Sequence, residues 1–115
     1  MSRTTPLLKV FVAAGMTALF SMPCLAADIA VFEVTIQQNH FVPDRIEVPS
    51  GQKFKLRVKN EGAGAEEFES SDLNREKVIR AGASTDIFLG PLSPGQYKFS
   101  GEFHADTAKG VIIAK

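Results

Sequence analysis

YKFSGEFHADTAKGVIIAK, residues 97–115, predicts a strand, a polar loop and a second strand at the end of the chain. Its first part is rich in aromatic residues and residues 111–113 are β-branched, and both kinds of residue favour strands. The loop carries His104 between Glu102 and Asp106. Imidazole is a common metal ligand, and a nearby carboxylate can bind the same ion or orient the ring. The loop is therefore a candidate metal site, with an ordinary surface histidine as the alternative.

The first 27 residues have the order of a secretory signal peptide. Arg3 and Lys9 are basic, residues 7–19 are mostly apolar, and small residues follow around the expected cleavage site after Ala26 or Ala27. The apolar run is too short to span a bilayer. We therefore expect residues 1–27 to be removed and residues 28–115 to form one exported, periplasmic domain. A lipid anchor on Cys24 is the alternative.

The expected domain has 88 residues and no sulfur, because Cys24 and all three methionines precede residue 28. It therefore has no disulfide, thiol nucleophile, thiolate ligand or thioether ligand. Its 11 basic and 13 acidic residues give no electrostatic case for nucleic acid, and we expect no direct membrane insertion. No Ser-His-Asp set with evident spacing supports a hydrolase.

Alternation of apolar and polar residues predicts seven to eight short strands and no amphipathic helix. The first strand is expected over residues 29–37, where Phe32, Val34 and Ile36 form the buried face. Further strands are expected at 45–49, 53–59, 66–69, 77–80 and 85–89, before the final pair. Many short strands with turn signals between them indicate an all-β fold, a two-sheet Greek-key sandwich.

Strand direction predicts that several chemically active residues meet at one end of this sandwich. If the strands at 29–37 and 53–59 run the same way, the loops that follow them lie together. The final pair adds its own loop at that end. This loop end would then hold His40, Glu66, Glu67 and His104. Loops on a rigid scaffold commonly carry function.

With these pieces in view, the chain resembles cupredoxin-like domains. More narrowly, it is similar to the periplasmic cupredoxin-like proteins of ferrous-iron uptake systems built around a high-affinity iron permease. The segments EEFES, LNREKV, GPLSPGQYKF and GEFHADTAKG carry this resemblance. It implies a metal-binding accessory protein that binds iron or copper, assists Fe(II) oxidation before transport, and works with the permease and other periplasmic iron-uptake components.

The chain departs from the blue-copper pattern of this family at three places. His104 matches the second histidine ligand, but Gly101 stands at the cysteine position and Ala108 stands near the methionine position. Glu66 or Glu67 stands where the first histidine would be. Without a thiolate, blue-copper electron transfer is excluded.

What remains is a set of oxygen and imidazole donors, which suits iron, Cu(II) or Mn(II). We rank His104 and Glu67 first as ligands, followed by His40, Glu66, Glu69, Glu102 and Asp106. If Phe68 points into the core, Glu66 points with it while Glu67 and Glu69 share the opposite face. The alternative for this acidic segment is an exposed edge that discourages strand pairing.

A second hypothesis needs no metal. Lys53, Lys55 and Arg57 alternate with apolar residues and would form a basic sheet face. That face would make the domain a docking module for a membrane permease or a binding protein.

Overall fold

The computed structural model describes Gly15 and residues 28–115. The predicted signal peptide at 1–27, including Cys24 and the expected cleavage site, lies outside the described residues apart from Gly15. Among the described residues, no helix is long and apolar enough to cross a membrane.

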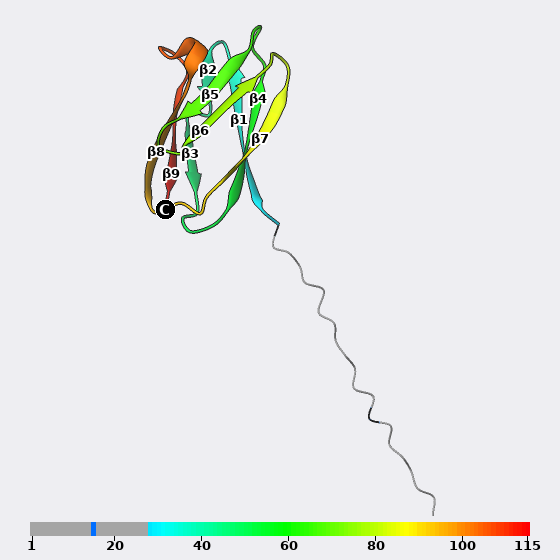
Figure 1. The fold of residues 1–115 in the computed structure, drawn as a ribbon, viewed down its shortest axis with the longest axis vertical. Helices are drawn as coiled ribbons and strands as arrows, with labels where there is room; N and C mark the ends of the chain where they lie inside the picture. Colours follow the sequence, from blue (N-terminus) through cyan, green and yellow to red (C-terminus); the bar gives the residue numbers. More distant parts are fainter. Residues whose placement is uncertain (1–14, 16–27) are drawn as a thin grey trace, which may run out of the picture.

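Nine strands and one short 3-10 helix, η1, make up the described domain (Figure 1). In chain order they are β1 (Ala30–Gln37), β2 (His40–Val42), β3 (Arg45–Val48), β4 (Phe54–Asn60), β5 (Glu66–Ser70), β6 (Arg75–Ile79), β7 (Ser84–Leu89), β8 (Gly95–Gly101), η1 (Glu102–His104) and β9 (Lys109–Ala114). The expected strands all form, with ends that differ by one or two residues.

The strands form two sheets packed face to face. One has four strands in the order β2-β1-β4-β7, and the other has five in the order β3-β9-β8-β5-β6. Strands β1 and β4 run parallel, as do β3 and β9, while the other paired strands are antiparallel. The predicted all-β, two-sheet sandwich is confirmed.

Strand β2 is the element that the sequence did not predict. No strand was expected between residues 37 and 45, but Gln38 and Asn39 form a two-residue turn, after which His40 pairs with Gln37. Both turn residues have positive φ, 48° and 62°, which is the geometry of the tight hairpin turn that matches strand twist. The sequence signal for this turn is weak because its second residue is not glycine.

The aromatic core lies between the two sheets. Phe41 of the four-stranded sheet packs edge-on against Phe99 of the five-stranded sheet, with ring centroids 4.9 Å apart. Phe68 stacks on Phe99 at 5.1 Å. All three side chains are buried. This packing fixes β5 and β8 relative to each other, and with them the loops at their ends.

The loop end predicted from strand direction is present in the fold. In Figure 1, η1 (orange) lies at the same end of the sandwich as the β1–β2 turn. The Thr107 hydroxyl donates a hydrogen bond to the Asn39 carbonyl at 2.7 Å, which joins the two segments. The first residue of β5 also reaches this end, where Glu66 contacts His104.

Candidate functional site

Glu66 is a carboxylate buried at the loop end. Residues along β5 alternate between buried and half-buried, so Glu66 lies on the same inner face as Phe68. Glu66 is only 1% exposed. Because an unpartnered buried carboxylate is costly, its contacts determine what this end of the domain can do.

Three nitrogen atoms surround the Glu66 carboxylate. Its Oε1 accepts hydrogen bonds from the backbone N–H groups of Glu67 at 3.0 Å and Phe103 at 2.9 Å. Its Oε2 lies 2.6 Å from His104 Nδ1. Glu66 therefore links the start of β5 to η1 through both backbone and side chain, and no buried side-chain polar atom of the described residues lacks a partner.

Gly101 supplies the space for this carboxylate. A Cβ placed on Gly101 would lie 2.7 Å from both Ala108 Cβ and Glu66 Cδ, and 2.9 Å from Glu66 Oε2. Such separations are shorter than van der Waals contact, so a side chain here would displace its neighbours. The position that resembles the cysteine of blue-copper domains is thus closed by the carboxylate of Glu66.

Glu67, ranked first together with His104, is not the acid that meets the histidine. It follows Glu66 on β5, so its side chain points to the opposite, half-buried face, and only its backbone N–H reaches the site. The strict alternation of β5, anchored by Phe68, places Glu66 there instead. The sequence pattern assigned these two faces correctly, and the structure brings Glu66 rather than Glu67 into contact with His104.

The other acids lie together outside the buried pair. Glu69 is directly opposite Glu76 in the β5–β6 register, and η1 carries Glu102. Hydrogen bonding to the Glu102 carboxyl, then its negative charge, raise the pKa of Glu69 to about 7, with smaller contributions from Glu76 and Glu67. The cluster is thus an acidic surface beside the site rather than a part of the buried pair.

His40 and Asp106 are nearby but separate. His40 is exposed on β2, and its imidazole makes no hydrogen bond with any residue that the structure describes. The hydrogen bond from Thr107 to Asn39 brings its segment beside the loop of His104. Asp106 is exposed on that loop and likewise makes no side-chain hydrogen bond among residues 28–115.

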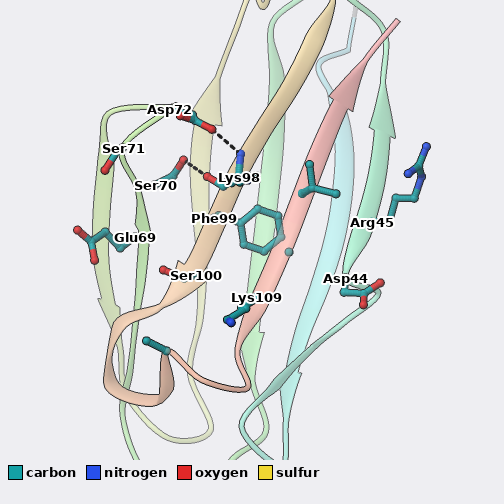
Figure 2. A pocket seen from close by; sticks show the side chains of 13 residues that line it. Asp44, Arg45, Glu69, Ser70, Ser71, Asp72, Lys98, Phe99, Ser100 and Lys109 are labelled. Carbon is teal, nitrogen blue, oxygen red and sulfur yellow. Dashed lines mark hydrogen bonds between the residues drawn. The ribbon is translucent and has the colours of Figure 1, made fainter.

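A separate groove of about 860 Å³ lies against the five-stranded sheet. Figure 2 shows Glu69 and Ser71 on one side, Asp44 and Arg45 on the other, and Lys109 between them. Both acids and bases line this groove, so it has no single sign of charge. Neither Glu66 nor His104 borders it, and it is distinct from the candidate site.

The basic face of β4 is neutralised by its neighbours. The Arg57 guanidinium donates to the Asp86 carboxylate at 2.9 Å and 3.4 Å, and Lys55 lies 3.6 Å from the same acid. Arg57 and Lys59 also lie within 4 Å of Glu33. Lys55, Arg57 and Lys59 thus face acids of β1 and β7, whereas Lys53 makes no ion pair with any residue that the structure describes. These pairs weaken the case for a basic docking surface.

A buried thiolate copper centre does not fit these residues. The cysteine position holds Gly101, the carboxylate of Glu66 fills the space beside it, and Ala108 has no donor atom. Within the described part of the chain, no group of three or more His, Cys, Asp or Glu side chains is arranged to hold a metal ion. The imidazole of His104, held by the carboxylate of Glu66, suits iron, Cu(II) or Mn(II), with the rest of the coordination shell left to water or to another molecule.

Sequence reasoning missed the backbone contribution to the site. The N–H groups of Glu67 and Phe103 fix the Glu66 carboxylate, and no residue-type pattern predicts such donors. Gly101 was identified only as a departure from the blue-copper pattern. The sequence feature that could have indicated its role is a glycine at the end of an aromatic-rich strand, because such a glycine often marks the close approach of another group.

Comparison with known proteins supports the fold. Residues 10–114 match the family described as cupredoxin-like domain. The chain is 45% identical over 86 residues to Uncharacterized protein RP394 of Rickettsia prowazekii (strain Madrid E), an alignment that covers 75% of this chain and 69% of the relative.

Solved structures agree. Auracyanin A, a "blue" copper protein from Chloroflexus aurantiacus, is similar with a TM-score of 0.66 at 11% identity, covering 76% of this chain and all of that one (100%). The metal-binding domain of the Streptococcus pneumoniae D39 Cu(I)-exporting P-type ATPase CopA is similar with a TM-score of 0.63 at 14% identity. The match covers 74% of this chain and 84% of that domain. Amicyanin from Paracoccus versutus is similar with a TM-score of 0.58 at 14% identity, covering 77% of this chain and 83% of amicyanin. At these identities the likeness is one of fold, and together with the family match it leads to one conclusion: this chain belongs to the cupredoxin-like domain family.

Proposed function

We propose that this chain is a periplasmic metal-binding accessory protein of iron uptake, which binds iron or copper at His104. The observation that carries the proposal is the imidazole of His104 at the loop end, paired at 2.6 Å with the buried carboxylate of Glu66. A carboxylate that accepts from a ligating histidine is a recurrent feature of metal sites, because it fixes the ring and raises its basicity.

The surroundings favour cations over anions. Glu67, Glu69 and Glu102 belong to the acidic surface beside the pair, and clustered charge of one sign concentrates counter-ions near a protein surface. An iron ion bound at His104, with oxygen atoms of water or of a partner completing its coordination shell, would supply redox chemistry biased toward Fe(III), which would assist oxidation of Fe(II) before transport. The protein's own part is to hold the imidazole, to leave coordination positions open and to attract the ion.

The role in iron uptake rests on the resemblance carried by EEFES, LNREKV, GPLSPGQYKF and GEFHADTAKG. It makes a high-affinity iron permease and other periplasmic iron-uptake components the expected partners. The two parts of the proposal, metal binding and iron uptake, need separate tests.

Metal binding is tested by titrating the exported protein with Fe(II) under anaerobic conditions, with Mn(II) and with Cu(II). His104→Ala should weaken binding by at least tenfold, about 1.4 kcal/mol. His40→Ala is the matched control, since it removes the chain's other histidine from the same end of the sandwich. If His104→Ala binds every metal as the parent does, His104 is not a ligand and the metal-binding proposal fails.

Iron uptake is tested by deleting the protein in its source organism and measuring accumulation of radioactive iron supplied as Fe(II). Uptake should fall, the parent protein should restore it, and His104→Ala should not. Unchanged uptake in the deletion strain would remove the iron-uptake role while leaving metal binding intact. Copper accumulation measured in the same strains separates the two candidate ions.

A further inference from the structure

The imidazole of His104 presents different edges to the protein and to solvent. The Nδ1 edge faces Glu66, whose side chain is 2% exposed, whereas the His104 side chain is 39% exposed. Nε2 makes no hydrogen bond with any residue of the described domain. Every buried side-chain nitrogen in that domain does have a hydrogen-bond partner, so Nε2 is not one of the buried atoms. Nε2 therefore reaches solvent.

The partner of Nδ1 is itself held firmly. Two backbone N–H groups hold Glu66 Oε1, and the missing side chain of Gly101 gives the carboxylate a fitted space. The backbone of His104 is fixed as well, because its carbonyl accepts from the N–H groups of Thr107 at 3.1 Å and Ala108 at 2.8 Å. With both partners constrained, the short contact between Oε2 and Nδ1 sets the orientation of the ring.

We infer that Glu66 is a positioning residue that keeps the proton of His104 on Nδ1, so that a metal ion binds Nε2 from the solvent side. This inference rests on the proposed function and deepens it. It places the ion outside the domain rather than between Glu66 and His104, where the ion would have to displace the proton and separate two atoms only 2.6 Å apart.

A single imidazole nitrogen at the surface leaves most of the coordination shell to water or to a second protein. Ions held in this way exchange readily, because few bonds to the protein must break. The site therefore suits an ion received from, or passed to, a partner that brings oxygen ligands of its own. Phe103, 51% exposed beside His104, gives such a partner an apolar contact next to the ion.

The test is ¹⁵N NMR of the exported protein labelled with ¹⁵N, at about pH 8, where an ordinary imidazole is neutral. Long-range ¹H–¹⁵N correlations identify the protonated ring nitrogen, and His40→Ala assigns the two rings. His104 should carry its proton on Nδ1. Diamagnetic Zn(II) should then shift Nε2 and leave the proton on Nδ1. A proton on Nε2 in the metal-free protein, or loss of the Nδ1 proton on adding Zn(II), would overturn the inference.

Variants separate positioning from packing. Glu66→Gln keeps the shape but can donate to Nδ1 as well as accept, so it should populate the other tautomer and weaken Zn(II) binding by at least tenfold. Asp28→Asn, which removes an exposed acid before the start of β1 and away from the loop end, should change neither. Unchanged tautomer and affinity in Glu66→Gln would refute positioning. If that variant does not fold, the NMR experiment on the parent protein still decides.

The two proposals fail in different ways. If the parent binds Zn(II), Cu(II) and Fe(II) no better than His104→Ala, the proposed metal site itself is wrong. If binding depends on His104 but occurs through Nδ1, the metal-binding function stands and only the positioning role of Glu66 is lost.

Discussion

At the scale of single residues, Gly101 and Glu66 depend on each other for space. The closest atoms to a Cβ on Gly101 would be Ala108 Cβ and Glu66 Cδ, both at 2.7 Å. Replacing the glycine by any larger residue must therefore push the carboxylate away from its donors. The same contact explains how this domain lacks the cysteine of blue-copper proteins without leaving a cavity.

Gly101→Ala should reduce the free energy of unfolding by about 1–3 kcal/mol, because the added methyl group overpacks the site. Urea denaturation of the metal-free protein measures this. Gly64→Ala is the control, since a Cβ there meets no atom within 4 Å. Equal stability of Gly101→Ala and the parent would show that the carboxylate moves freely and that the fitted space is not a constraint.

Asn60 is a buried residue whose side chain makes three hydrogen bonds to backbone groups. It is 1% exposed, its Nδ2 donates to the carbonyls of Gly64 and Ile79, both at 2.9 Å, and its Oδ1 accepts from Gly62 N–H at 2.9 Å. One amide thus closes the loop that precedes β5 and ties it to β6. This loop therefore positions Glu66, the first residue of β5.

Asn60→Ala should therefore cost about 2–3 kcal/mol of unfolding free energy, because it leaves three backbone groups without their partner. Thermal and urea unfolding measure the loss. Gln52→Ala, an exposed amide with no side-chain hydrogen bond in the described domain, should change stability little. A loss in Asn60→Ala no larger than in that control would mean that water replaces the amide fully.

At the scale of elements, alternation along each strand was the information that the sequence carried best. It predicted the burial of Val34 and Ile36 on β1, the alternation of apolar and basic residues along β4, and the shared face of Glu66 and Phe68 on β5. It could not predict β2, since the Gln38–Asn39 turn depends on positive φ in residues that only tolerate it. It also could not predict how Glu66 is held against His104, because one of its donors is the backbone N–H of Phe103 in another segment.

The outer face of β5 makes a pH-dependent contribution to stability. Hydrogen bonding to the Glu102 carboxyl, followed by the negative charge of Glu102, raises the pKa of Glu69 from 4.5 to about 7. Between these values the native protein binds a proton that the unfolded chain has released. The contribution of Glu69 to the free energy of unfolding is therefore full below pH 4.5 and is lost as pH rises through about 7.

Glu69→Gln should remove this dependence. In urea unfolding at about pH 5 and about pH 8, the parent should lose more stability on going to the higher pH than Glu69→Gln does. Chelator in all samples keeps metal ions from masking the effect. Asp28→Asn, which removes one exposed acid elsewhere, should retain the slope of the parent. Parallel slopes for Glu69→Gln and the parent would exclude a raised pKa at Glu69.

At the scale of the whole molecule, sequence and structure agree on a sandwich whose chemistry is confined to one end. Strand direction alone predicted that the loops after β1 and β4 and the loop before β9 lie together. The contacts Thr107–Asn39 and His104–Glu66 show this arrangement in the structure. The sequence could not foresee that the site would have only two donors in contact. That outcome depends on side-chain orientation at the ends of strands, where twist and turns vary.

The fold should not need a metal ion. Two contacts of Glu66 already join β5 to η1, the hydrogen bond from the Phe103 N–H and the contact with His104 Nδ1. The stacked and edge-on rings of Phe41, Phe68 and Phe99 join the two sheets without any ligand. In metal-dependent small domains the ion supplies folding energy directly, and a chelator unfolds them. Here the carboxylate takes the place between strand and loop that an ion would otherwise occupy.

Thermal unfolding followed by circular dichroism, with and without EDTA, tests this. The midpoint should change by less than about 2 °C, which for a domain of this size corresponds to a few tenths of a kcal/mol. Saturating Zn(II) should raise the midpoint of the parent, because a ligand that binds only the folded state stabilises it, and should do so less in His104→Ala. His40→Ala should respond to Zn(II) as the parent does. If EDTA instead unfolds the protein at room temperature, an ion holds β5 and η1 together, and the hydrogen bonds of Glu66 are not enough to do so.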